Sequence, residues 1–160
     1  MKWILIFTLL LAFQAPAQPR VVEVPDGFTR MNDVIYKQVD DWEGKMDLYL
    51  PPAGEGLSPV LIVIHGGGWR HGSKEQMGGF NAWFNMGFAV VNVGYRLSDV
   101  AKAPAAIEDI RCAVSFIVNR AAEYHIDPNR IVYAGMENSE HHSCILFGSC
   151  YGATDFPNTH

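Results

Sequence analysis

A run of apolar residues ends in three consecutive glycines, and this junction is where the sequence offers its clearest chemistry. Residues 60–64 are all apolar, and they are followed by His65, Gly66, Gly67, Gly68 and Trp69. Glycine tolerates positive φ and lets a ligand come close to the backbone. We therefore predict a buried strand whose end presents backbone N–H groups to a small anion.

The apolar pattern on either side predicts an α/β fold built on a parallel sheet. The predicted strands are residues 60–64, 88–93 and 131–134, short and largely apolar runs that suit parallel strands covered on both faces. Residues 74–86 are predicted to be a helix, which Gly78 and Gly79 weaken. The alternation of strands and helices predicts helices on both faces of the sheet.

One further helix has the clearest periodicity in the chain. Its apolar residues recur at the spacing of one helix face: Ile107, Ile110, Val114, Ile117 and Ala121. Pro104 in its first turn, with Glu108 and Asp109 shortly after, suits the start of a helix. We interpret both acids as residues that interact favourably with the helix dipole at its N-terminus, and not as catalytic carboxylates.

The residues before the first buried strand predict an N-terminal hairpin. Residues 18–33 contain proline and glycine breakers and are expected to be an irregular lead-in. Residues 34–39 are predicted to be the first strand. In the second strand, apolar side chains alternate with Lys45, Asp47 and Tyr49, so we expect one buried face.

Residues 1–17 have the features of a signal peptide. Lys2 precedes an apolar run, and Ala-Pro-Ala at residues 15–17 fits the pattern for cleavage before Gln18. The sequence therefore predicts a secreted or periplasmic protein that does not contact a membrane after cleavage. An uncleaved anchor helix is the alternative, although the apolar run is short for a bilayer span.

Charge and cysteine content narrow the classes of function. The formal net charge is −5 and no run of lysines and arginines occurs, so we expect no nucleic-acid partner. Cys144 and Cys150 are the only pair close in sequence, whereas Cys112 lies within a predicted helix and is interpreted as a core residue. No motif predicts a cofactor, and we expect none.

Four motifs occur in the order and at the spacing of one known family. They are His-Gly-Gly-Gly-Trp at 65–69, Tyr-Arg-Leu-Ser at 95–98, Pro-Ala-Ala-Ile-Glu-Asp at 104–109 and Ile-Asp-Pro-Asn-Arg-Ile at 126–131. Over residues 34–135 the chain resembles the carboxylesterase-like branch of the α/β-hydrolases, which includes enzymes related to acetyl-xylan and feruloyl esterases. These residues would form the N-terminal part of such a domain.

The resemblance implies a carboxylic-ester hydrolase that works by serine acyl transfer. Gly67 and Gly68 would form its oxyanion hole, and His65, Gly66 and Trp69 would line its pocket. His65 is expected to brace the loop, because the backbone performs the function in this motif. The implied substrate is a small-molecule ester or a carbohydrate-linked ester.

The sequence departs from the family pattern directly after Gly135. The family places a nucleophilic serine two residues later, in a tight turn between small residues. Here Glu137 holds that position, and Ser139 is the candidate nucleophile, followed by the bulky Glu140 and His141. We do not find the acid and histidine that follow the later strands. We therefore predict an incomplete, C-terminally truncated α/β-hydrolase fold with impaired catalysis.

Two other interpretations of residues 136–160, a divergent tail, stay open. One is a non-catalytic fragment of a truncated or frame-disrupted hydrolase. The other is a metal-binding tail, whose ligands would be His141, His142, Cys144, Cys150 and His160. Their spacing matches no established zinc pattern, so no metal site is predicted.

Overall fold

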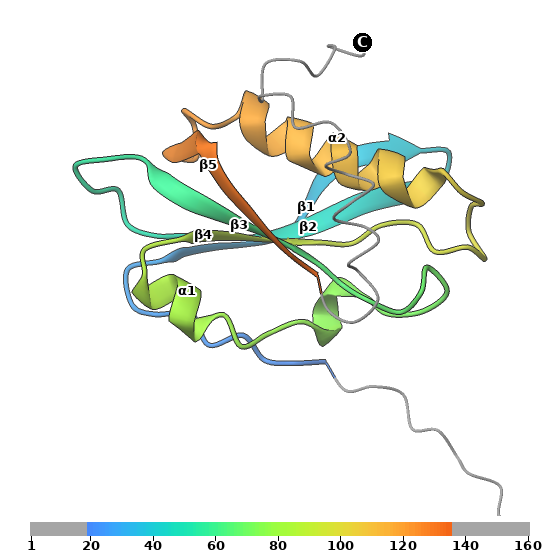
Figure 1. The fold of residues 1–160 in the computed structure, drawn as a ribbon, viewed down its shortest axis with the longest axis horizontal. Helices are drawn as coiled ribbons and strands as arrows, with labels where there is room; N and C mark the ends of the chain where they lie inside the picture. Colours follow the sequence, from blue (N-terminus) through green and yellow to red (C-terminus); the bar gives the residue numbers. More distant parts are fainter. Residues whose placement is uncertain (1–18, 136–160) are drawn as a thin grey trace, which may run out of the picture.

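The computed structural model describes residues 19–135, in which a mixed five-stranded sheet has helices against both faces (Figure 1). The strands are β1 (Thr29–Val39), β2 (Trp42–Leu50), β3 (Ser58–Ile64), β4 (Ala89–Val93) and β5 (Ile126–Gly135). The helices are the 3-10 helix η1 (Lys74–Gln76), α1 (Asn81–Asn85) and α2 (Ala105–Asn119).

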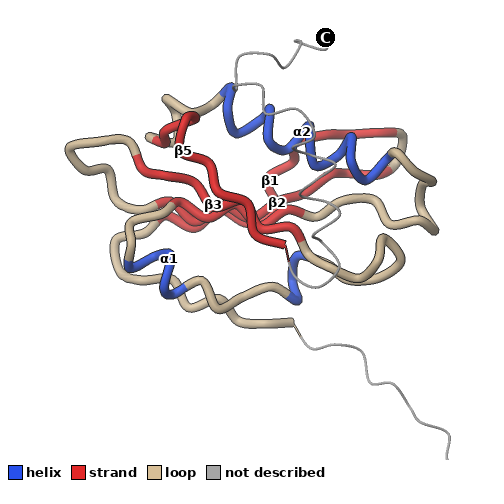
Figure 2. The backbone as a smooth tube through the Cα atoms, viewed as in Figure 1, coloured by secondary structure: helices blue, strands red, loops and turns tan. Residues whose placement is uncertain are grey.

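The strands are ordered β1-β2-β4-β3-β5 across the sheet. β1 and β2 form an antiparallel hairpin, and β2 also runs antiparallel to β4. β3 pairs in parallel with both β4 and β5. α2 covers one face, while α1 and η1 lie against the other (Figure 1 and Figure 2). The predicted hairpin, parallel strands and two-sided helical cover are confirmed.

The first strand is longer than predicted. β1 begins at Thr29 rather than at Val34, so the end of the expected irregular lead-in belongs to the sheet. The pairing with β2 shifts between Met31 and Val34, and Asp33 in this interval has a φ of 55°. A β-bulge therefore interrupts the ladder at a place where the apolar pattern gives no sign of a strand.

The predicted helix over residues 74–86 is wrong in its middle. η1 ends at Gln76 and α1 begins only at Asn81. Between them Gly79 has a φ of 77°, a conformation that glycine reaches without steric cost. The two glycines divide the segment into two short helical turns.

β2 is buried on both faces, whereas the alternation predicted one. Asp47 and Tyr49 are 7% and 1% exposed. The Tyr49 ring lies 6.0 Å from the ring of Phe80 and 5.8 Å from that of Phe84. The segment around α1 covers this second face, so residues at the expected outer positions are enclosed.

α2 is the helix that the periodicity predicted. Ile110, Val114 and Ile117 are buried in the cluster between α2 and the sheet. Ile107 is only partly buried, and Ala121 lies beyond the end of the helix, although it packs against the same cluster. The packing face is therefore displaced slightly toward residues such as Ala113.

Several predictions concern residues that the structure does not describe. The signal peptide, Ser139, the cysteines at 144 and 150 and the histidines of the tail all lie outside residues 19–135. Cys112 is partly buried and packs against the core beneath α2. Within the described range, no helix is long and apolar enough to cross a membrane.

Candidate active site

β3, β4 and β5 are parallel neighbours, so their carboxyl ends lie at the same end of the sheet. In open α/β sheets, ligands bind in the crevice outside the carboxyl ends of the strands. The three glycines follow β3, and the segment with the Tyr-Arg-Leu-Ser motif follows β4. We name these segments the glycine loop, residues 65–72, and the β4 loop, residues 94–98.

The path of the glycine loop requires glycine at two positions. φ is 114° at Gly67 and 100° at Gly72. A Cβ atom at Gly67 would collide with the carbonyl oxygen of His71, and one at Gly72 would collide with the carbonyl oxygen of Gly66. The loop is therefore packed tightly on itself.

Hydrogen bonds within the loop use the carbonyl group of Gly67 and not the N–H groups of Gly67 and Gly68. The carbonyl oxygen of Gly67 accepts the N–H groups of Arg70 and His71, at 3.1 and 3.2 Å. Gly68 and Trp69 at the tip have φ values of 59° and 68°. Among residues 19–135, the N–H groups of Gly67 and Gly68 donate to no partner.

The β4 loop contacts the glycine loop at its first residue, His65, and at its tip, Trp69. The Tyr95 hydroxyl donates to the His65 carbonyl oxygen at 2.9 Å, and its ring stacks on the His65 imidazole at 4.1 Å. The Ser98 N–H donates to the Trp69 carbonyl oxygen at 2.7 Å. The glycine loop and the β4 loop, which follow the carboxyl ends of neighbouring strands, are thus held together.

His65 is enclosed by these contacts. Burial lowers the pKa of its imidazole, and the hydrogen bond to Gly66 opposes this only in part. Its Nδ1 lies 2.9 Å from the Gly66 carbonyl oxygen, and since a carbonyl only accepts, Nδ1 carries the proton. These contacts support the interpretation of His65 as a brace for the loop.

Asp109 anchors the β4 loop to α2. Its buried carboxylate accepts a hydrogen bond from Lys37 Nζ at 2.9 Å, and three from Arg96, through the backbone N–H, Nε and Nη2, at 3.1, 2.8 and 2.7 Å. Burial would raise the pKa of Asp109, but the hydrogen bonds from Arg96 and Lys37 outweigh it and hold the pKa below its usual value. The interpretation of Asp109 as a helix-dipole acid misses this role, because both partners are distant in sequence.

A second buried ion-pair centre lies where the chain leaves the glycine loop. Lys74 Nζ lies 2.8 Å from Asp47, 2.9 Å from Asp33 and 3.1 Å from Glu75. Burial would lower the pKa of Lys74, but its hydrogen bonds to the three carboxylates outweigh this and raise the pKa. No pattern in the sequence predicted this centre.

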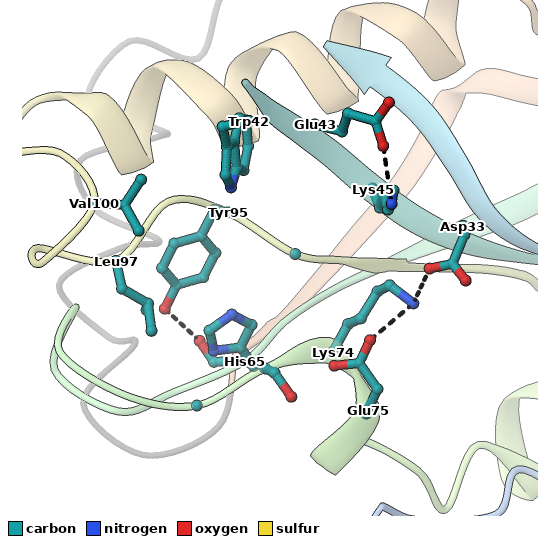
Figure 3. Close-up of a pocket in the computed structure, with 13 residues that line it drawn as sticks. Asp33, Trp42, Glu43, Lys45, His65, Lys74, Glu75, Tyr95, Leu97 and Val100 are labelled. Carbon is teal, nitrogen blue, oxygen red and sulfur yellow. Dashed lines mark hydrogen bonds and ion pairs between the residues drawn. The ribbon is translucent and has the colours of Figure 1, made fainter. Parts of the chain in front are cut away.

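A shallow cavity of about 260 Å³ lies beside the glycine loop (Figure 3). One side is aromatic and apolar, with Trp42, Tyr95, Leu97 and Val100. The other side carries the ion pairs Lys45–Glu43 and Lys74–Asp33, at 2.9 Å each. The cavity is bounded by β1, β2 and the loops after β3 and β4, so it lies on the hairpin side of the glycine loop.

The predicted site residues divide between described and undescribed parts of the chain. The structure places His65, Gly66, Gly67, Gly68 and Trp69 in one loop, and of these only His65 lines the cavity. Ser139 lies outside the described residues. Between residues 19 and 135, no group of three histidine, cysteine, aspartate or glutamate side chains could hold a metal ion.

Comparison with known sequences finds relatives among esterases. The family model described as BD-FAE matches residues 46–158, which include the glycine loop. A carboxylesterase of Mycobacterium tuberculosis is 36% identical over 90 residues, covering 55% of this chain and 28% of that protein. The chain spans about a quarter of the length of the curated relatives it matches.

Comparison with solved structures gives the same class of protein. A truncated form of a carbohydrate esterase from gut microbiota matches with a TM-score of 0.64 and 27% identity, covering 78% of this chain and 45% of that one. A bifunctional GH43-CE protein of Bacteroides eggerthii matches with a TM-score of 0.61 and 35% identity, covering 70% and 16%.

Proposed function

The chain belongs to the BD-FAE family and has the fold of carboxylesterase-like α/β-hydrolases, and from this premise we propose that it hydrolyses carboxylic esters. The reaction is a two-step acyl transfer. A serine hydroxyl attacks the ester carbonyl and expels the alcohol, and water then releases the acid. Negative charge develops on the carbonyl oxygen in both steps, so the site needs donors aimed at that oxygen.

The observation that carries the proposal is the pair of N–H groups at Gly67 and Gly68. They lie directly after β3, in a loop fixed by its own hydrogen bonds and by the β4 loop, and no partner among the described residues uses them. Donors held in place need no reorganisation when charge develops, and one such donor contributes about 3 kcal/mol. We assign the oxyanion hole to these two residues.

In this proposal the nucleophile is Ser139. It is the first serine after β5, the strand that pairs with β3 in the sheet. Glu137 holds the position that the family gives to serine. This departure favours the second candidate, a hydrolase-like protein without turnover, so the function of Ser139 is the decisive test.

We propose a small ester, including one linked to a carbohydrate, as the substrate class. The similar proteins include a carboxylesterase and a carbohydrate esterase. The cavity beside the glycine loop combines the aromatic rings of Trp42 and Tyr95 with charged groups, which suits one small ring next to the ester. The signal-peptide pattern predicted for residues 1–17 leads us to propose that the protein acts after export.

Hydrolysis of p-nitrophenyl acetate by the purified full chain tests the proposal. Ser139→Ala should abolish turnover, whereas Ser149→Ala, a serine of the same C-terminal region, should retain it. If the folded wild-type chain shows no turnover that depends on Ser139, ester hydrolysis is rejected for this chain. The interpretation as a non-catalytic hydrolase then stands.

A glycine substitution tests the oxyanion hole separately. Gly67→Ala should lower kcat on the order of 10²-fold, because the new Cβ would collide with the His71 carbonyl and displace the loop. Gly54→Ala is the matched control, since no atom lies within 4 Å of a Cβ at Gly54. A Gly67→Ala enzyme with the wild-type rate contradicts the assignment.

A further inference from the structure

Lys74 connects the segment that leaves the glycine loop to three strands of the sheet. Its ammonium group contacts Asp33 on β1 at 2.9 Å and Asp47 on β2 at 2.8 Å. Its backbone carbonyl oxygen accepts a hydrogen bond from Asn92 Nδ2 on β4 at 2.8 Å. Figure 3 shows the side chain extended from η1 toward Asp33. Both ends of this residue are therefore tied to the sheet.

The partners of Lys74 are themselves linked. Asp47 Oδ1 also accepts the backbone N–H of Asp33 at 3.0 Å, so the β1 bulge and β2 present their carboxylates together. Glu75 adds a third carboxylate at 3.1 Å. The Lys74 side chain is only 8% exposed despite its charge. Burial of a lysine is costly, and here an arrangement of carboxylates compensates for it.

Lys74 lies just after the glycine loop, so its contacts bear on the position of that loop. Gly72 lies two residues before it and packs against the start of the glycine loop. A Cβ at Gly72 would collide with the Gly66 carbonyl oxygen and would lie 2.8 Å from His65 Nδ1. Gly72 therefore packs directly against His65 and Gly66, the residues before Gly67, and a displacement of Lys74 would disturb them through this contact.

We propose that Lys74 is a positioning residue for the oxyanion donors Gly67 and Gly68. It fixes the exit of the glycine loop to β1, β2 and β4, while the β4 loop fixes the entrance and the tip. The proposal rests on the oxyanion role proposed above. Such a residue acts through the loop, and a displacement of about 1 Å in a reacting group can cost about 10²-fold in rate.

Direct contact between Lys74 and the substrate is the competing explanation, because Lys74 also lines the cavity. The two roles differ in their kinetic signature. A group that binds substrate equally in the ground state and the transition state changes KM, whereas misplaced oxyanion donors lower kcat. Measuring both constants separates them.

The experiment uses the full chain labelled with ¹⁵N-glycine, so that the Gly67 and Gly68 amide signals report the loop whether or not turnover occurs. Lys74→Met removes the charge and keeps the length of the side chain, and Lys74→Arg keeps the charge. Lys45→Met is the matched control, because Lys45 lines the same cavity and pairs with Glu43.

Lys74→Met should shift both glycine amide signals and speed their hydrogen exchange. With p-nitrophenyl acetate, kcat should fall about 10- to 100-fold while KM stays within about twofold. Lys74→Arg should recover most of the lost kcat and return both signals toward their wild-type positions. Lys45→Met should leave both signals unchanged.

Unchanged Gly67 and Gly68 signals in a folded Lys74→Met protein overturn the proposal, and so does a raised KM with unchanged kcat. If Lys74→Met does not fold, Asp33→Asn replaces it, since it removes an exposed carboxylate from the same ammonium group. A smaller shift of the same two signals then supports the proposal, and no shift overturns it. A wild-type chain without turnover rejects the proposed function, and the amide signals still decide the role of Lys74.

Discussion

The two buried ion-pair centres of this sheet have opposite charge arrangements. On the face that α1 and η1 cover, the single cation Lys74 lies among three carboxylates. On the face that α2 covers, the single carboxylate Asp109 lies between Lys37 and Arg96. Each centre joins the hairpin to a loop at the carboxyl edge of the parallel strands.

The centres differ in how much charge would be left buried if the central residue were lost. Asp33 and Glu75 have side chains that are 60% and 51% exposed, so water already solvates them. Asp47 beside Lys74 and Arg96 beside Asp109 are equally enclosed, at 10% and 11% exposed, but the other partner of Asp109, Lys37, is only 20% exposed. An unpaired charge costs most where water cannot reach it. Asp109 should therefore contribute more to stability, whereas Lys74 is placed to control the glycine loop.

Asp109→Ala should have the largest effect on stability. It leaves the guanidinium group of Arg96 and the ammonium group of Lys37 without their carboxylate, which should lower the free energy of unfolding by about 3–5 kcal/mol. Urea denaturation of the full chain measures the change. A loss below about 1 kcal/mol would show that Asp109 is not the stronger centre.

Lys74→Met should cost less, about 2 kcal/mol, because only Asp47 among its three partners is enclosed. The same urea measurement gives the value. The comparison between the centres fails if this loss equals or exceeds that of Asp109→Ala.

The dependence of stability on pH should distinguish the two central groups, because the titration of Asp109 acts in acid and that of Lys74 acts in base. The pKa of Asp109 is lowered in the folded protein, so the unfolded chain binds the proton first as pH falls. The free energy of unfolding should therefore decline as pH falls below about 3.9, the usual value for aspartate. Lys74 has a raised pKa, so the titration of the ammonium group itself lowers the free energy of unfolding as pH rises above about 10.4.

The Asp109→Asn variant isolates the acid effect from that of other carboxylates, such as Glu75, whose pKa is also lowered. As pH falls below about 3.9, the usual pKa of aspartate, the free energy of unfolding of this variant should decline less steeply than that of the wild type. Parallel acid profiles for the two proteins would contradict the prediction.

Asn92→Leu should have the smallest effect. The substitution removes the hydrogen bond to the Lys74 carbonyl oxygen, but it also removes the buried Oδ1 atom, which has no partner among the described residues. The two changes oppose each other, so the free energy of unfolding should change by less than about 1 kcal/mol. A loss above about 2 kcal/mol would show that the Asn92 hydrogen bond contributes substantially to the stability of the Lys74 centre, contrary to this prediction.

The sequence predicted the features that depend on local pattern. β3 and β4 are largely apolar because both faces of the sheet are covered, and this made them recognisable as strands, although β4 also carries the buried polar residue Asn92. The glycine loop was recognisable for a similar reason, since the glycines directly follow a buried strand. The helical spacing from Ile107 to Ile117 identified α2.

The two ion-pair centres could not be predicted, because their partners are brought together only by the fold. Lys74 and Asp47 are 27 positions apart, and Asp109 and Lys37 are 72 apart. Asp47 alternates with apolar residues and was assigned to an exposed face, which the segment around α1 in fact covers. The β1 bulge likewise aims Asp33 at Lys74 without any sign in the apolar pattern.

The two partners of Asp109 lie at very different separations along the sequence, and this bears on the order of folding. Its contact with Arg96 closes a chain segment of 13 positions, and its contact with Lys37 closes one of 72. The difference in closure entropy is about 1.5 kcal/mol. β4 and α2 can therefore dock before the hairpin joins them, and the amino group of Lys37 should slow unfolding more than it speeds folding.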